Sequence, residues 1–263
     1  MYDFFCIHDY TLHVMSFREF LLFEGAIEVS PIPLPELLSR HAVIAMRLTS
    51  NVKILPLFEK YLKYGCYPFY KRDSDGFGQR LQKAVHAVLY EDVPAVEEIT
   101  YPTILKLSRM LMILAAHVPQ TPKMNELYAI LETNREQGMK LLYMLQRAGL
   151  LHLLSTEMKE FGNLVKPDKI FLYDPNMMYA LGDNANTGTV RETFFINQLS
   201  AIATVNYPRK GDFLVNHKHL FEVGGKGKKF DQIKDIPASY LAIDDTEIGH
   251  GNRIPLWLFG FLY

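Results

Sequence analysis

This chain of 263 residues has few cysteines and tryptophans, 2 and 1 respectively, and no large excess of charge of either sign. Cys6 and Cys66 lie far apart and fit neither a disulfide framework nor a Cys-x-x-Cys zinc motif, so we expect a reducing compartment. Lys plus Arg total 28 and Asp plus Glu total 29, for a net charge of −1. This balance excludes a uniformly basic surface for nucleic acid but leaves room for a local basic face.

Long hydrophobic runs are also absent. No apolar stretch approaches the roughly 20 residues that span a bilayer, and the N-terminus lacks the basic and apolar regions of a signal peptide. Hydrophobic residues make up 49% and charged residues 22%, which excludes a disordered, collagen-like or coiled-coil chain. We therefore expect a soluble cytoplasmic protein with no membrane partner.

Changes of pattern along the chain predict an α+β protein of several modules. Ser16 and Glu19 form a capping box, and Gly25 is a signal for the end of a helix. Together they predict a short helix between these residues. Three prolines between residues 31 and 35 predict an extended segment. Apolar residues then recur at helical spacing over residues 55–64, 81–99 and 101–118, which predicts a small helical bundle.

Residues 119–173 predict a winged helix-turn-helix. A helix from Pro122 to about Leu131 precedes a tight turn, and a capping box of Thr133 and Glu136 begins a second helix that Gly149 ends. Strand-like runs follow over residues 150–155 and 169–173. Helix, tight turn, helix and β-hairpin is the order of a winged helix-turn-helix.

The exposed face of the second helix and the hairpin beside it carry candidate DNA-binding residues. Arg, Lys and Gln side chains read base edges or hold phosphates. The predicted DNA-binding residues are Arg135, Gln137, Lys140, Arg147, Lys166 and Lys169. The alternative is a winged helix that packs on another protein, because Glu132 and Glu136 dilute the positive field.

Residues 174–263 predict a mixed α/β region, with helices over 189–203 and 230–236. Strands are expected over residues 212–215, 219–223, 239–244 and 254–259. A turn of residues 216–218 would set Val215 opposite His219, and counting outward then sets Asp212 opposite Glu222.

Asp212 and Glu222 form the candidate metal and catalytic site. Directly opposed residues lie about 5 Å apart at Cβ, and two carboxylates at that distance repel unless a cation or proton intervenes. They could hold Mg²⁺, which would activate water against a phosphodiester. Glu192 could add a third carboxylate, and Lys226 in the glycine–lysine run could neutralise a phosphate. The alternative is an exposed strand pair near Lys210 or Lys226, with a solvated loop.

The sequence predicts no nucleotide-binding residues. The glycine–lysine steps at 225–226 and 227–228 lack a following Ser or Thr and the GxxxxGK[ST] frame of a phosphate loop. Residues 241–245, an apolar run ending in acids, are expected to form a core strand. We therefore expect no cofactor apart from a possible Mg²⁺ at Asp212 and Glu222.

Several motifs resemble those of prokaryotic AAA-type ATPases. Residues 15–21 (MSFREFL) are similar to the segment that follows the nucleotide-binding core of these proteins, and residues 58–68 (FEKYLKYGCYP) look like a second signature. Residues 92–95 and the predicted winged helix follow in the family's order. Residues 191–223 are similar to a C-terminal domain of these ATPases that has no established function and is related to PD-(D/E)xK nucleases.

This resemblance implies a restriction-endonuclease-like α/β domain at the C-terminus. It divides the chain into a remnant of the ATPase core (1–35), a helical lid (36–118), a winged helix (119–173) and the nuclease-like domain (174–263). The family's phosphate loop should precede Ser16, so the chain resembles a truncated, C-terminal part of such an ATPase. The nuclease motif requires Glu-x-Lys, whereas Glu222 is followed two places later by Gly224 and the first lysine is Lys226.

We therefore expect the C-terminal region of an AAA-type ATPase, which does not hydrolyse ATP alone and binds duplex DNA or a protein partner. One alternative is a Mg²⁺-dependent nuclease that uses Asp212, Glu222, Lys226 and Glu192. Another is a protein-interaction module. Lid helices over residues 81–118 that lack a packing partner would expose an apolar patch and favour self-association.

Overall fold

The computed structural model describes residues 11–72, 75–117, 123–156, 165–182 and 185–263. In these ranges the fold is mixed α+β, with helices, a two-stranded hairpin and a five-stranded mixed sheet. The sequence therefore predicted the fold class correctly at this level.

Helix α1 (Phe17–Phe23) begins at the predicted capping box. The side chain of Ser16 accepts a hydrogen bond from the backbone of Glu19, and the Glu19 side chain accepts one from the backbone of Ser16. Gly25 follows with a φ of 71°, a left-handed conformation that suits glycine after a helix. Local sequence alone fixes both ends of this helix.

Helix α1 packs into the same core as the C-terminal residues. The ring of Phe17 lies 5.1 Å from that of Phe58 and 5.9 Å from that of Phe261. The Arg18 guanidinium donates from Nε to the carbonyl oxygen of Tyr263 at 2.7 Å. Helix α1, which lies in the segment predicted as a remnant of the ATPase core (1–35), therefore packs into the core of this chain.

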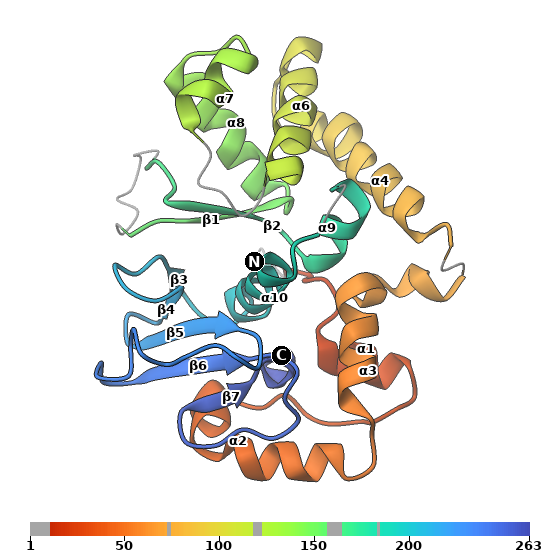
Figure 1. Ribbon diagram of the computed structural model, residues 1–263. Coiled ribbons are helices and arrows are strands. Elements are labelled where there is room, and N and C mark those ends of the chain that lie inside the picture. Colours follow the sequence, from red (N-terminus) through yellow and green to blue (C-terminus); the bar gives the residue numbers. More distant parts are fainter. Residues whose placement is uncertain (1–10, 73–74, 118–122, 157–164, 183–184) are drawn as a thin grey trace, which may run out of the picture.

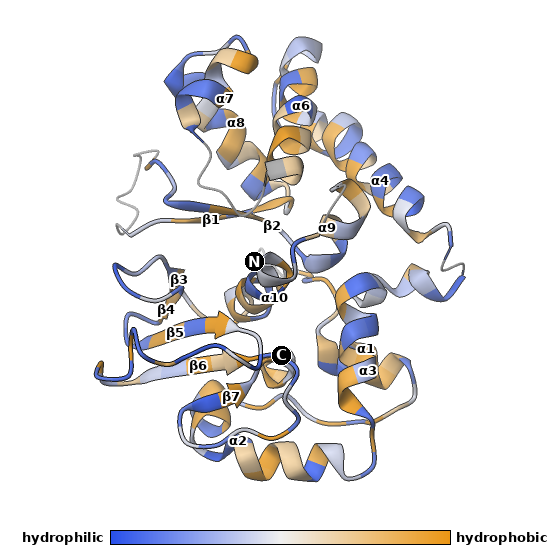
Figure 2. Cartoon of the chain, viewed as in Figure 1, coloured by the Kyte–Doolittle hydropathy of each residue, from blue (hydrophilic) through white to orange (hydrophobic). Residues whose placement is uncertain are grey.

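Helix α2 (Leu34–Thr49) begins at Leu34, although an extended segment was predicted through Pro35. Pro35 lies in the first turn of the helix, where the backbone N–H has no intrahelical partner, so a proline costs no hydrogen bond there. Hydrophobic and hydrophilic residues alternate along α2 in Figure 2. Its buried side packs against the last strand of the large sheet, β7 (Arg253–Pro255).

The next helices contain two π-helical turns. Helix α3 (Ile54–Lys60) continues into a π-helical turn, Tyr61–Gly65, and helix α4 (Phe77–Ala87) continues through a second such turn, residues 88–92, into α5 (Val93–Val96). The helix predicted over residues 81–99 therefore begins four residues early and ends at Val96.

The predicted order of helix, turn, helix and hairpin is present after α6 (Tyr101–His117). The four elements are α7 (Met124–Ile130), α8 (Arg135–Arg147), β1 (Leu151–Leu154) and β2 (Lys169–Leu172), and the two strands pair antiparallel. The predicted capping box of Thr133 and Glu136 is wrong. Asn134 caps α8 instead, because its side chain accepts from the backbone N–H of Gln137.

Helices α9 (Pro175–Leu181) and α10 (Thr187–Ser200) connect the hairpin to the large sheet, and α10 packs against its central strand. The strands in spatial order are β3 (Val205–Asn206), β4 (Phe213–Val215), β5 (His219–Gly224), β6 (Ser239–Ile243) and β7. Strands β3, β4 and β5 pair antiparallel, whereas β5, β6 and β7 pair parallel. Figure 1 shows the hairpin between α8 and this sheet.

Two predictions about the C-terminal region are wrong. Residues 230–236 form turns rather than a helix, with the Lys234 N–H bonded to the carbonyl oxygen of Phe230 at 3.0 Å. The strand predicted over residues 254–259 is short and gives way to a 3-10 helix, Leu256–Phe261. In a segment that is buried all round, periodicity does not separate a strand from a helix.

Buried apolar side chains form one hydrophobic core that extends from Phe17 to Leu262 and crosses the predicted boundaries at residues 35, 118 and 173. Those boundaries stay predictions. None of the helices in the described ranges combines the length and apolar character that crossing a bilayer requires.

Candidate functional site

The hairpin of β4 and β5 has the predicted register, and it brings Asp212 to Glu222. Val215 pairs with His219 and Phe213 with Phe221. One residue further out, the Asp212 N–H donates to the Phe221 carbonyl oxygen at 2.8 Å. The Asp212 carboxylate in turn accepts the N–H of Val223 through Oδ2 at 2.9 Å. Asp212 is therefore fixed against the β5 backbone on either side of Glu222.

Glu222 is a buried carboxyl group whose charge is not compensated by hydrogen bonds. Its side chain has no exposed surface, and neither carboxylate oxygen has a hydrogen-bond partner among the described residues. Burial raises the pKa of Glu222, the nearby charge of Lys228 opposes this, and the charge of Asp212 raises the pKa further. The alternative of an exposed strand pair is therefore wrong for Glu222.

Lys169 supplies a cation to this group from a different part of the fold. Its ammonium Nζ lies 3.3 Å from Glu192 Oε2 and 4.0 Å from Asp212 Oδ1. The three side chains are only 18–20% exposed. Burial raises the pKa of Glu192, and Lys169 opposes that rise. We call Lys169, Glu192, Asp212, Glu222 and Lys228 the carboxylate–lysine cluster.

The second lysine near the cluster is Lys228 rather than the predicted Lys226. Lys226 lies exposed in the turn after β5. The Lys228 side chain instead lies over Gly224, where an added Cβ would come within 2.7 Å of it. Its charge lowers the pKa of both Glu222 and Glu192. The absence of a side chain at Gly224 therefore lets a lysine four positions later approach the carboxylates.

The cluster fits an ammonium group better than a divalent metal ion. Within the described ranges, no group of three or more His, Cys, Asp or Glu residues could hold a metal ion. Lys169 already lies between Glu192 and Asp212. A divalent ion placed there would be repelled by the ammonium charge.

Four of the predicted DNA-binding side chains lie on α8. Arg135, Gln137, Lys140 and Arg147 are all exposed. Lys140 pairs with Glu136 one turn away at 2.7 Å, and Arg147 pairs with Glu97. Exposed pairs of this kind contribute at most about 1 kcal/mol each, so both cations can exchange their carboxylate for a phosphate.

The two predicted hairpin lysines differ in their surroundings. Lys166 is exposed just before β2, whereas Lys169 belongs to the carboxylate–lysine cluster. The structure therefore leaves the α8 residues and Lys166 exposed and places Lys169 among carboxylates.

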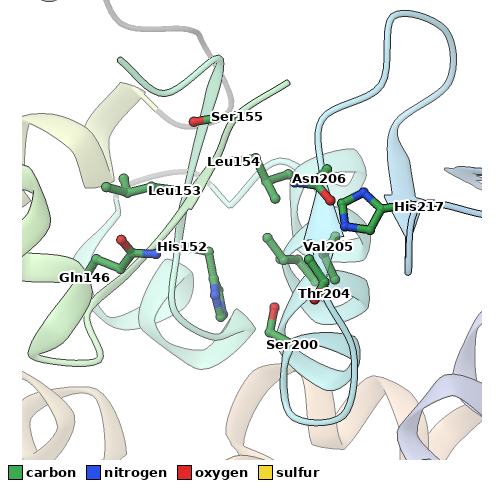
Figure 3. A pocket seen from close by; sticks show the side chains of 11 residues that line it. Gln146, His152, Leu153, Leu154, Ser155, Ser200, Thr204, Val205, Asn206 and His217 are labelled. Carbon is green, nitrogen blue, oxygen red and sulfur yellow. The ribbon is translucent and has the colours of Figure 1, made fainter. Parts of the chain in front are cut away.

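A cavity of about 330 Å³ separates strand β1 from β3 and α10. In Figure 3, Leu153 and His152 lie on one side of it, and Ser200, Val205 and Asn206 on the other. His152 bonds through Nε2 to the Tyr173 carbonyl oxygen at 2.9 Å, and burial lowers its pKa to about 4. The wall at His152 is therefore uncharged at neutral pH. No pattern in the sequence singles out this histidine.

A buried polar network around Asp174 was also missed. Asp174 has no exposed surface, and it accepts hydrogen bonds from the Tyr67 hydroxyl at 2.6 Å and the Met177 N–H at 3.0 Å. Burial raises the pKa of Asp174 to about 6, despite these bonds. The thiol of Cys66, a free and buried cysteine, lies beside it. The Asp-Pro step at 174–175 is a helix-start signal that could have identified this aspartate.

Of the comparisons with known proteins, one found a match, and it covers the middle of the chain. No curated protein and no solved structure matches it. A family model described as a domain of unknown function (DUF8612) matches residues 55–188. The matched region runs from α3 to the first turn of α10, and it includes α8, the hairpin, Lys169 and Asp174 but stops before Glu192. Because the match spans half of its length, this chain belongs to the DUF8612 family.

Proposed function

We propose that this protein binds duplex DNA through α8 and the hairpin β1–β2 and does not cut it. The observation that carries the proposal is the set of exposed polar side chains on α8. Arg135, Gln137, Lys140 and Arg147 are all exposed on the second helix of a helix–turn–helix–hairpin unit. In winged helix-turn-helix proteins, the second helix of the pair is the one that enters the major groove.

The buried face of α8 supports this orientation. Gly138, Met139, Leu142 and Leu145 face inward, so packing holds the helix and leaves the polar face outward. Gly138 lies against the ring of Tyr128 in α7, where an added Cβ would come within 2.3 Å. This close contact fixes the angle between the two helices that would meet DNA.

The carboxylate–lysine cluster supports binding without cleavage. Carboxylates, a mixed sheet and a preceding helix resemble the arrangement expected of a degenerate PD-(D/E)xK domain. Lys169 places an ammonium group beside Glu192 and Asp212, two of the carboxylates that a nuclease would need to hold a divalent ion. The proposal therefore gives this region a structural role in holding the hairpin.

The motifs that resemble AAA-type ATPases support a place for this region in the C-terminal part of such a protein. The sequence lacks a GxxxxGK[ST] frame, so we propose that the chain does not hydrolyse ATP by itself. ATP turnover by the purified protein above the level of a buffer blank would contradict this part of the proposal.

The first experiment is a titration of labelled duplex DNA with the purified protein at two salt concentrations, with and without Mg²⁺. Binding should weaken as salt rises, because phosphate contacts release counterions. Arg135→Ala combined with Lys140→Ala should weaken binding about tenfold or more. Lys83→Ala removes an exposed lysine of α4 and should leave binding unchanged. Equal affinity in all three proteins would overturn the proposal.

A Mg²⁺-dependent nuclease is a second candidate, and the observation that favours it is the unpaired, buried carboxylate of Glu222 beside Asp212. It predicts cleavage of DNA that requires Mg²⁺ and disappears in Asp212→Ala and in Glu222→Ala. DNA that stays intact with 10-fold excess protein over hours would rule it out.

A protein-interaction module is a third candidate, favoured by exposed apolar side chains on α6. Tyr101, Leu105 and Met112 are 63%, 45% and 49% exposed, and their spacing places them on one side of the helix. A concentration-dependent dimer in sedimentation, abolished by Leu105→Glu, together with no DNA binding would favour this candidate.

A further inference from the structure

Lys169 belongs to two parts of the molecule at once. Its backbone pairs with Leu154 across the hairpin, and its ammonium lies between the carboxylates of Glu192 and Asp212. The hairpin is the element that would lie along the DNA backbone, whereas the carboxylates belong to α10 and to the residue before β4.

The same corner holds the other strand of the hairpin to the sheet. The N–H of Tyr207, just after β3, donates to the carbonyl oxygen of Ser155, just after β1, at 3.1 Å. The ring of Tyr207 also lies under the Lys169 ammonium, with Nζ 5.5 Å from its centre. Both strands of the hairpin are therefore attached to the sheet where Lys169 meets the cluster.

An ammonium held in this way is not available to a phosphate. Its side chain is 20% exposed, and a phosphate oxygen would have to replace the Glu192 oxygen at hydrogen-bonding distance and the Asp212 oxygen 4.0 Å away. If the Lys169 ammonium left the cluster, Glu192 and Asp212 would also lose the cation that lies between them. Their mutual repulsion would then rise.

We propose that Glu192 and Asp212 restrain DNA binding by holding Lys169 inside the protein. DNA phosphate and the two carboxylates compete for the same ammonium group, so the cluster sets the affinity of the hairpin for DNA. This inference rests on the proposed DNA-binding function, and it adds to that function an internal competitor built from named side chains.

The test is a double-mutant cycle in DNA binding. Glu192→Gln removes one competing charge while keeping the side chain's shape. It should tighten binding about fivefold, because losing an ion pair of about 1 kcal/mol with Lys169 corresponds to that change in affinity. In the Lys169→Met background, the same substitution should give no such gain. The salt dependence should also steepen by about 0.9 in log–log slope in Glu192→Gln, because one more phosphate contact is made.

Two further variants complete the design. Glu59→Gln removes an acid of α3 that pairs at the surface with Lys63 of the following π-helical turn, and it reports the effect of net charge alone. Asp212→Asn removes the second competing charge and keeps an oxygen that can accept the Val223 N–H. It should also tighten binding, which keeps the inference testable if Glu192→Gln unfolds. Circular dichroism and melting temperature verify that each variant is folded.

The outcomes separate the inference from the proposed function. A gain that depends on Lys169 supports the inference. An equal gain in both backgrounds, a gain matched by Glu59→Gln, or no gain at all overturns it while DNA binding stands. No binding of duplex DNA by the wild-type protein at low salt overturns the proposed function, and the inference falls with it.

Discussion

The hydroxyl of Tyr67 donates a hydrogen bond of 2.6 Å to the carboxylate of Asp174, although the two residues are 107 positions apart in the chain. The bond joins the segment after the first π-helical turn to the start of α9. Asp174 also caps α9 by accepting the Met177 N–H. A buried, titratable group thus holds two distant segments together, and stability should depend on its protonation.

Asp174→Asn should change how stability depends on pH. The folded-state pKa of about 6 lies above the value of about 4 expected in the unfolded chain. The folded state therefore binds the proton more tightly, and this contribution is present below pH 4 and is lost as pH rises through 6. The loss amounts to about 2–3 kcal/mol. Urea unfolding between pH 4 and 7 should show a flatter profile for Asp174→Asn, whereas Asp231→Asn, at an exposed site, should keep the wild-type profile.

His152 should act in the opposite direction. Its pKa is lowered to about 4 in the folded state, below the value of about 6.5 in an unfolded chain. The unfolded state therefore binds the proton more tightly, so stability present above pH 6.5 is lost as pH falls toward 4. His152→Phe should remove this loss, which is about 3 kcal/mol. An unchanged slope of unfolding free energy between pH 6.5 and 4 in the variant would contradict this account.

Asn176→Ala should destabilise the fold more than any exposed asparagine change. Asn176 accepts the N–H of Cys66 at 2.8 Å and donates to the carbonyl oxygens of Tyr61 and Leu62 at 3.0 and 2.9 Å. These bonds satisfy backbone groups around the π-helical turn, and their loss leaves buried polar atoms unpaired, at a cost of about 3 kcal/mol or more. Asn186→Ala, which removes the exposed cap of α10, should cost about 1 kcal/mol. Chemical denaturation of both variants makes the comparison.

Gly65→Ala should also be strongly destabilising. An added Cβ would lie 2.4 Å from the ring of Tyr61 and 2.7 Å from that of Phe20, and both rings are fully buried. Overpacking of this kind costs about 1–3 kcal/mol or more. Gly78→Ala meets nothing within 4 Å near the start of α4 and should be neutral or stabilising by about 0.5–1 kcal/mol. Equal melting temperatures for the two variants would show that the core at Gly65 adapts.

Short-range interactions explain the predictions that were confirmed. The capping box of Ser16 and Glu19 involves residues three positions apart. The hairpin register at Val215 and His219 follows from the turn, in which Asn216 and His217 both have positive φ values. The prediction of Thr133 as the cap of α8 was wrong because the turn places the next residue, Asn134, at the N-cap position.

The sequence by itself determined the α+β class, the order of helix, turn, helix and hairpin, and the approach of Asp212 to Glu222. Each of these depends on helical periodicity, capping or turn geometry within a few residues. Only the tertiary structure decided that Lys169 joins Glu192 and Asp212, that Lys228 approaches the carboxylates, and that Tyr67 binds Asp174. These contacts depend on how whole elements pack on one shared core, and no local pattern in the chain encodes the distance between two such elements.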